Sequence, residues 1–347
     1  MRLEPIAHPP LSRRLGLPIT ALVATFLVGA VLVMIAGADP FQTFGLIVKG
    51  SVGSKFALLE TLNRATPLIF TGLAVATAFR ARLWNIGAEA QFYAGAVVTA
   101  ALGTGLIGWP WVLPVSAVAA AIAGALILLG PVLMKTKLGV DEVVTTLLLN
   151  FVMLLFVSYL LEGPMKDPMG MGWPKSTALV KEARLPRIVT GLRLHWGFVI
   201  AIIAAVVLWL IEKRTTFGFE MRAVGANAEA ARFAGMPVNR VLVLTALMSG
   251  GLAALGGWSE VAGLKGHLSA DLSPGFGYTG IVVAMLAMLN PLAVVPSALF
   301  VAAIFVGSDS MSRAAGVPTY IADMLLATAL LLMVLSLKLT RFRVVRE

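Results

Sequence analysis

Long apolar runs separated by short polar connections dominate this chain. A membrane-spanning helix needs about 20 consecutive apolar residues, and several of the runs reach that length. The pattern therefore predicts an all-α, polytopic transmembrane helical bundle that forms a single transmembrane domain over residues 1–347, with both termini on the cytoplasmic side. We count ten apolar segments, at residues 15–37, 67–79, 85–107, 111–134, 140–161, 194–211, 241–262, 278–289, 292–306 and 320–337.

The composition agrees with a membrane protein. The chain is 59% hydrophobic and 13% charged, with a mean hydropathy of +0.92, whereas soluble domains have about 25% charged residues. The net charge of +10 is assigned to basic loops that flank spans rather than to nucleic-acid binding, with sixteen of 27 Lys and Arg inside and eleven outside. The predicted external loop, residues 162–193, opposes this trend because it carries six basic residues.

Several kinds of chemistry have no support in the sequence. There are no cysteines and three histidines, so disulfides are excluded and a histidine metal site is not expected. The chain contains no GxxxxGK[ST] phosphate loop, no HExxH and no GxSxG. We therefore expect no enzymatic activity and no cofactor bound by this chain.

The most heavily charged connection is residues 212–240, with five basic and three acidic residues. Asn227 suits an N-cap, Glu229 complements the helix dipole in the first turn, and Gly235 suits a left-handed position after the helix. A helix of about seven residues is unstable alone, so it needs a surface to pack on. We predict a cytoplasmic loop that contacts a partner through the small Ala230 and Ala231, with apolar contact from Phe233 and Met236.

Three stretches place polar groups within or beside apolar segments. Residues 80–91 follow a segment that is too short to span, which predicts a broken span buried in protein or lining a wet cavity. An interfacial loop that holds Arg80 and Arg82 at lipid headgroups is the alternative.

The second stretch puts Glu142, Thr145 or Thr146, and Asn150 on one helix face. Hydrogen bonding between helices explains such a stripe as well as a substrate pathway does. The third, residues 273–291, holds glycines that allow a re-entrant entry or tight helix packing. The pathway candidates are Asn85, Gly87, Glu89, Gln91, Thr145, Thr146, Asn150, Gly277 and Tyr278.

Four ordered motifs carry a resemblance to a known family. Residues 229–235 resemble the EAAxxxG element of ABC importer permeases, and residues 218–235 are similar to the coupling loop of permeases for simple sugars, nucleosides and branched-chain amino acids. NIGAEAQ, GVDEVVTTLLLN and GFGYTGIVVAMLAMLNP are similar to the nucleoside and simple-sugar branch, although Ala90 stands where that branch usually has glycine. The coupling residues implied are Arg222, Gly225, Asn227, Glu229, Ala230, Ala231 and Gly235.

The resemblance implies a multi-pass permease subunit in the bacterial inner (plasma) membrane. It implies a partner ATPase that binds the ATP, an external substrate-binding protein, and a second permease chain in a homodimer or heterodimer. Nucleosides are the first choice of substrate and simple sugars the second. Two alternatives from other classes are a membrane scaffold subunit that transports nothing and an ion-coupled secondary carrier.

Overall fold

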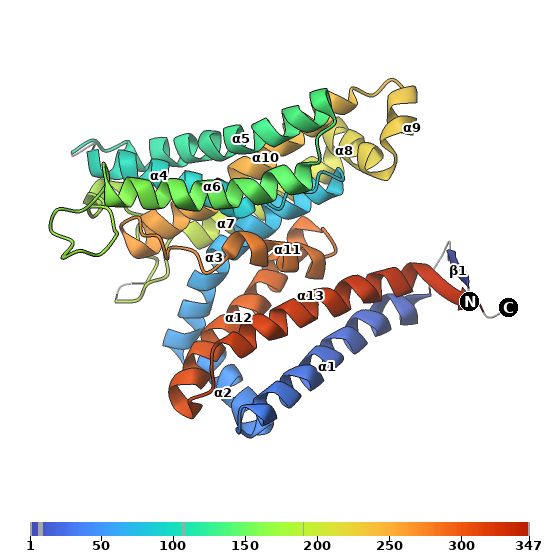
Figure 1. The fold of residues 1–347 in the computed structure, drawn as a ribbon, viewed down its shortest axis with the longest axis horizontal. Coiled ribbons are helices and arrows are strands. Elements are labelled where there is room, and N and C mark those ends of the chain that lie inside the picture. Colours follow the sequence, from blue (N-terminus) through green and yellow to red (C-terminus); the bar gives the residue numbers. More distant parts are fainter. Residues whose placement is uncertain (1, 6–9, 106–107, 190, 346–347) are drawn as a thin grey trace. The chain divides into compact units, whose positions relative to one another are not determined.

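The computed structural model describes residues 2–5, 10–105, 108–189 and 191–345, and these residues are largely helical (Figure 1). The predicted all-α class is confirmed. Two short strands, β1 and β2, pair with each other in antiparallel orientation. The elements are β1 (Arg2–Pro5), α1 (Leu11–Ile35), α2 (Pro40–Val52), α3 (Lys55–Arg80), α4 (Ala88–Gly105), α5 (Val112–Leu138), α6 (Glu142–Glu162), the 3₁₀ turn η1 (Lys181–Ala183), α7 (Gly197–Arg214), α8 (Thr216–Ala226), α9 (Ala228–Phe233), α10 (Val238–Ser259), the π-helical turn η2 (Glu260–Lys265), α11 (Phe276–Leu286), α12 (Pro291–Ala315), α13 (Tyr320–Arg341) and β2 (Phe342–Val345).

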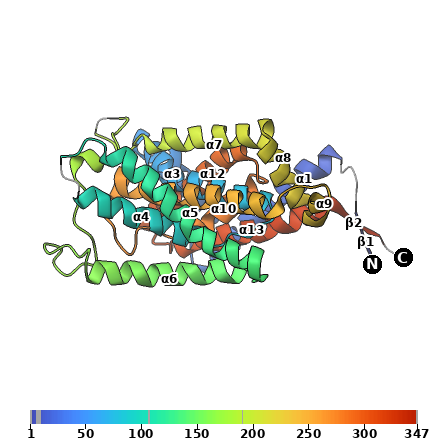
Figure 2. The ribbon, with the colours of Figure 1, turned by 90° about the horizontal axis from the view of Figure 1, so that it is seen from above.

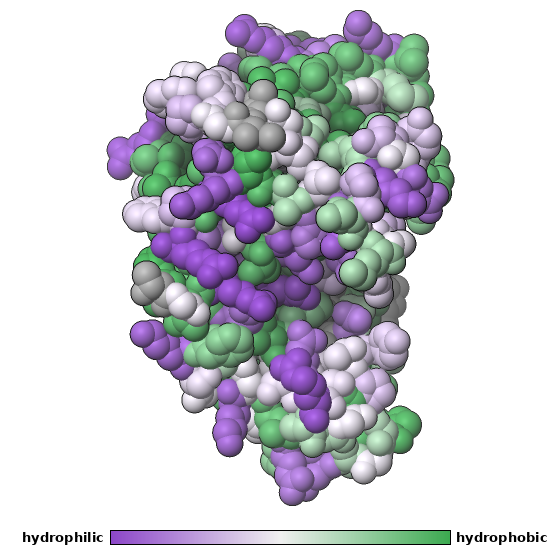
Figure 3. Space-filling model, turned by 90° about the vertical axis from the view of Figure 1, so that its left-hand side faces the viewer, coloured by the Kyte–Doolittle hydropathy of each residue, from purple (hydrophilic) through white to green (hydrophobic). Residues whose placement is uncertain are grey.

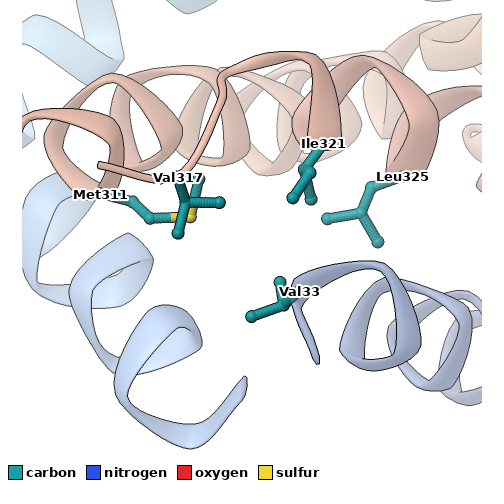
Figure 4. Close-up of a cluster of buried hydrophobic side chains, with 5 residues drawn as sticks. All are labelled: Val33, Met311, Val317, Ile321 and Leu325. Carbon is teal, nitrogen blue, oxygen red and sulfur yellow. The ribbon is translucent and has the colours of Figure 1, made fainter. Parts of the chain in front are cut away.

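The chain forms two compact units. The first contains Met1–Thr61 and Phe300–Glu347, and the second contains Leu62–Leu299. In the first unit α1 packs against α13, and Val33, Met311, Val317, Ile321 and Leu325 form its buried cluster (Figure 4). Because lipid is as apolar as these side chains, such a cluster is held by close packing rather than by exclusion of water.

In the second unit α10 packs against α4, α5 and α8. Figure 2 shows α5 and α10 crossing one another, with α6 and α7 on either side. A Cβ added at Gly250 would lie 2.3 Å from the carbonyl oxygen of Gly124, and one at Gly257 would lie 1.9 Å from that of Phe92. These glycines let the helix backbones touch, which is how helices associate in lipid.

One detail of the predicted segments is wrong. Residues 67–79 are not a short half-span, because α3 continues through Pro67 as one helix of 26 residues. Residues 39–66, between the first two predicted segments, form α2 and the first part of α3. A proline removes one backbone hydrogen bond, and the hydroxyls of buried Thr66 and Thr71 donate to the carbonyls of Leu62 and Pro67.

The count of ten spans is not confirmed. Among the described residues, four helices are long and apolar enough to cross a membrane, or five if the bent pair Ile19–Ile35 and Pro40–Val52 is one span. The four are the α5 and α6 helices, α10 continued through η2, and α12. The remaining described helices are shorter, less apolar or more charged, so their place relative to the lipid does not follow from length and composition.

Two polar segments lie at opposite ends of the second unit (Figure 1). Residues 163–196 are anchored at one end, where the amides of Val180 and Leu185 donate to the carbonyls of Gly103 and Ala262. Hydrophilic side chains gather on this face of the molecule (Figure 3). At the other end α8 packs against the last turn of α3, since a Cβ added at Gly225 would lie 2.0 Å from the carbonyl oxygen of Arg80.

Buried His195 closes the anchored segment. Its Nδ1 accepts a hydrogen bond of 3.1 Å from the amide of Gly197, and a Cβ added at Gly263 would lie 2.5 Å from its ring. Burial lowers the pKa of His195 to about 4. The imidazole is therefore neutral in the packed segment at pH 7, and protonation opposes this packing.

Labelling tests the predicted placement of residues 162–193. Met169 is exposed, so a single cysteine at that position is reachable by a membrane-impermeant maleimide. We expect Met169→Cys to react in intact spheroplasts, and a cysteine at exposed Arg232 to react only after lysis. Labelling of Met169→Cys only after lysis would overturn the external assignment.

The lowered pKa of His195 makes the packing of its segment depend on pH. In an opened segment His195 has the ordinary pKa of 6.5. Between about pH 6.5 and 4 the opened segment therefore binds a proton that the packed segment does not bind. We expect the thermal midpoint of the purified protein in nanodiscs to fall as the pH drops from about 6.5 towards 4, with no further contribution from this group below 4. His195→Gln should flatten this slope, whereas His267→Gln should leave most of it; an unchanged slope in His195→Gln would contradict the assignment.

Candidate functional site

The connection between α3 and α4 is a buried turn organised by Asn85. The side-chain amide of Asn85 donates to Gln91 Oε1 (2.9 Å) and to Ser249 Oγ of α10 (3.0 Å). Its oxygen accepts from the amide of Gly87 (3.0 Å) and from Gln91 Nε2 (3.0 Å). Asn85 therefore satisfies all its polar groups while it joins the turn to α4 and α10.

The polar face of α6 holds the same turn. Thr146 Oγ1 accepts from the amide of Ile86 (3.2 Å), and Asn150 Oδ1 accepts from the amide of Ala90 (2.9 Å). Asn150 Nδ2 donates to the carbonyl of Ile86 (2.9 Å) and to the hydroxyl of Tyr278 (3.0 Å). The first amides of a helix have no partner within the helix, so α6 supplies what the beginning of α4 lacks.

Helix α11 begins directly against the beginning of α4. The amide of Gly277 donates to Glu89 Oε2 (2.6 Å), and a Cβ added at Gly277 would lie 2.1 Å from the backbone nitrogen of Glu89. Ser273 Oγ accepts from the amides of Gly275 and Phe276 and so caps α11. One buried carboxylate thus lies in the first turns of two helices, where both helix dipoles favour an anion.

These contacts bring together every predicted pathway residue except Thr145. The hydroxyl of Thr145 donates to the carbonyls of Asp141 and Glu142 in its own helix, and Thr145 makes none of the contacts described above. Asn85, Glu89, Gln91, Thr146 and Asn150 are buried and bonded to their neighbours, while Tyr278 is exposed. The geometry is that of hydrogen bonding between helices, and contact of these residues with substrate stays a prediction.

Sequence reasoning missed the role of Arg80 at the end of α3. Its guanidinium donates to the carbonyl of Leu289 (2.6 Å) and pairs with Glu212 Oε2 of α7 (3.4 Å). Arg222 of α8 donates to the backbone carbonyl of Glu212. We call Arg80, Glu212, Arg222 and Leu289 the Arg80 junction; it connects α3, α7 and α8 to the residues that follow α11.

The backbone of this junction is strained. Met288 and Leu289 have φ values of 50° and 59°, in the left-handed region that residues other than glycine rarely adopt. Such a conformation persists only where the surroundings hold it, and the hydrogen bond from Arg80 to the Leu289 carbonyl does so. The sequence offered one signal for the junction, namely that Arg80 and Glu212 each directly follow an apolar run.

The short helix predicted in residues 212–240 is confirmed as α9. Asn227 Oδ1 accepts from the amides of Glu229 and Ala230, both at 3.0 Å, and Gly235 has a φ of 81°. One expectation for its faces is wrong: Ala231 is 4% exposed, so it packs within this chain instead of facing outwards. Phe233 on the same helix is 97% exposed.

The chain matches the family described as "Branched-chain amino acid transport system / permease component" over residues 57–335. It is 36% identical to the glucose ABC transporter permease of Haloferax volcanii, over 99% of this chain and 93% of that protein. It is 32% identical to the guanosine ABC transporter permease of Bacillus subtilis over 90% of this chain and 91% of the relative. A nucleoside ABC transporter permease of Lactococcus lactis is 29% identical over 91% and 89%.

The fold defines a helical, multi-pass membrane protein with a capped polar helix, α9, between α8 and α10. The chain belongs to the permease-component family that matches it, and its relatives place it with the ABC transporter permeases for nucleosides and sugars.

A glycine substitution tests the contact between α4 and α11. Gly277→Ala should force these helices apart, because its Cβ meets backbone rather than a flexible side chain. We expect a loss of about 1–3 kcal/mol, as for overpacking of a core, seen as a lower thermal midpoint in detergent. Gly105→Ala is the matched control, since a Cβ there meets nothing within 4 Å. Equal midpoints for the two variants would contradict the close contact.

Proposed function

We propose that this chain is the membrane permease of an ABC importer for small uncharged polar solutes, located in the bacterial inner (plasma) membrane. A partner ATPase binds and hydrolyses the ATP, an external binding protein delivers the solute, and a second permease chain completes the pathway. The chain itself binds no cofactor. The family match and the permease names of the relatives support this function.

One observation carries the ATPase partner: the almost complete exposure of Phe233 on a helix that is otherwise fixed in place. Helix α9 is capped by Asn227 and packs against α8 and α10, so the large aromatic side chain points away from a defined platform. Exposed aromatic residues on rigid elements are typical anchors of protein interfaces. Glu229 and Arg232 are also exposed on α9 and would act as rim charges that orient the partner.

The Arg80 junction provides a physical connection from that platform to the helices of the second unit. Displacement of α8 acts on α3 through the backbone contact of Gly225, and on α7 through Arg222. Arg80 in turn holds the carbonyl of Leu289, just after α11. Docking and ATP-driven movement of the partner would thus reach α11, whose other end lies against Glu89.

Nucleosides are the proposed substrates, with simple sugars second. Relatives named for guanosine, for nucleosides and for glucose all align over most of this chain. These solutes are uncharged and rich in hydroxyl groups. ATP-dependent uptake of labelled guanosine or glucose by proteoliposomes that contain the ATPase would support the importer. Uptake driven by an ion gradient without the ATPase would favour a secondary carrier, and no uptake under either condition would favour a scaffold.

Two matched phenylalanines test the ATPase interface. Phe233 and Phe41 are 97% and 90% exposed, but Phe41 belongs to α2 of the first unit and not to α9. We expect Phe233→Ala to weaken ATPase binding by about 2 kcal/mol or more, roughly 30-fold in Kd, because it removes an anchor. Phe41→Ala should leave the Kd unchanged, and Arg232→Ala should change it less than Phe233→Ala.

The measurement is titration of the nanodisc-embedded permease with the purified ATPase, together with uptake. Helix α9 should survive the Phe233→Ala change, because that side chain is 97% exposed and is not needed for packing. Normal binding and normal uptake by Phe233→Ala would contradict the proposed interface.

A further inference from the structure

Asn63 on α3 is a buried side chain with unused hydrogen-bonding capacity. It is 1% exposed, and neither its amide nitrogen nor its amide oxygen has a hydrogen-bond partner in the part of the chain that the structure describes. Pro67, four residues later, has no N–H to donate to the backbone carbonyl of Asn63. Buried polar groups are nearly always bonded, so an unbonded one of this kind calls for a functional explanation.

The helix register places a buried carboxylate opposite Asn63. Ser249 Oγ of α10 donates to the carbonyl of Ala74 on α3 (2.7 Å), and a Cβ added at Gly256 would lie 3.5 Å from the carbonyl oxygen of Pro67. From Ser249 to Gly256 the chain advances seven residues along α10, while the contacted residue on α3 moves back by seven, from Ala74 to Pro67. The two helices are therefore antiparallel. One further turn along this face brings Glu260, which is buried, opposite Asn63.

An aromatic ring and a guanidinium lie beside this position. The guanidinium of Arg64, the next residue on α3, lies 5.1 Å from the centroid of the Phe276 ring. Phe276 is the first residue of α11 and is buried, with its ring near that of Phe92. Arg64 thus connects this part of α3 to the beginning of α11 and to an aromatic surface.

This position differs from the buried turn around Asn85. The side-chain amides of Asn85, Gln91 and Asn150 are already bonded to other side chains and to backbone, whereas that of Asn63 is not. Asn63 lies about 25 Å along α3 from Arg80 at 1.5 Å per residue, far from the α8 end of the helix. Its amide offers both donors and an acceptor, which is the capacity needed to bind a hydroxyl or an amide edge.

We propose that Asn63 is a specificity-determining residue that hydrogen-bonds an uncharged, hydroxyl- or amide-bearing solute as it passes between α3, α10 and α11. Glu260 and Arg64 flank this site, and Phe276 provides its apolar wall. The inference rests on the proposed importer function. Here the site is enclosed, so a solute enters it when α11 moves away from α3 and α10. The Arg80 junction links the opposite end of α11 to α8, where the ATPase would act.

Uptake with substrate pairs tests this assignment. The purified permease, its ATPase and its binding protein are reconstituted, and the kcat/KM for tritiated guanosine is compared with those for inosine and 2′-deoxyguanosine. Glucose and 2-deoxyglucose serve as the pair if the wild-type chain transports sugar. A site that bonds a polar group discriminates strongly against analogues that lack it. We expect Asn63→Leu to lower kcat/KM for the parent solute at least about tenfold and to reduce the preference over one analogue by a similar factor.

Two further variants separate recognition from folding. Thr77→Val is the matched control on the same helix, because buried Thr77 bonds the carbonyl of Leu73 within α3; its substrate preference should equal that of the wild type. Asn63→Gln keeps the amide and should retain more of the preference than Asn63→Leu. If Asn63→Leu fails to reach the membrane, Asn63→Ser, a smaller residue that keeps one donor and one acceptor, replaces it in the same comparison.

The outcomes distinguish this inference from the importer function itself. If wild-type protein shows no ATP-dependent uptake of any probe, the proposed function fails and this inference fails with it. If wild type transports and Asn63→Leu keeps the same kcat/KM and the same preference between analogues, the site is overturned while the importer stands. An equal loss for parent and analogues would indicate that Asn63 only holds a structural water, which also overturns the site.

Discussion

The arrangement of the second unit depends on the hydrogen bond between the amide of Gly277 and the carboxylate of Glu89. This carboxylate lies in the first turn of α4 and accepts the amide of Gly277 in the first turn of α11. Two helix N-termini meeting in a buried place would leave several amides unbonded and would bring two positive dipole ends together. One carboxylate, with Ser273 capping α11 and Asn150 bonding α4, resolves both problems.

The same unit is assembled by close contact between backbones. Gly124 and Gly250 bring α5 and α10 together, and Gly257 brings α10 onto α4. Lipid gives these apolar helices no hydrophobic reason to associate, so the free energy comes from packing and from hydrogen bonds between helices. A substitution that adds one methyl group at such a contact therefore acts on the whole unit, not on a single side chain.

The two ends of this unit have different chemistry. At one end, residues 163–196 are tied down by backbone hydrogen bonds to α4 and η2 and by buried His195. At the other, the Arg80 junction combines an ion pair, a bonded carbonyl and a strained turn at Met288 and Leu289. This left-handed turn is held by the hydrogen bond from Arg80 and by the backbone bonds of Met288 and Leu289 to carbonyls of α11.

The class of protein and the short helix α9 could be predicted from the sequence, because both depend on local properties. Long apolar runs indicate membrane-spanning helices, and the positions of Asn227, Glu229 and Gly235 specify a capped helix whatever its surroundings. The polar residues at Asn85, Glu89, Asn150 and Gly277 could also be recognised, although not their partners. Pairing across 60 to 188 residues decides which atoms meet, and no local pattern encodes that.

Only the tertiary structure decided which side chains are exposed, which are buried and which are hydrogen-bonded. It showed that Ala231 faces inwards while Phe233 faces outwards, because the orientation of α9 is fixed by α8 and α10. It showed that α3 runs unbroken through Pro67, since the surrounding helices tolerate one lost hydrogen bond. It also left Asn63 buried and unbonded. The sequence by itself determined the kinds of groups and their local order, and the packing of distant helices determined which groups are satisfied.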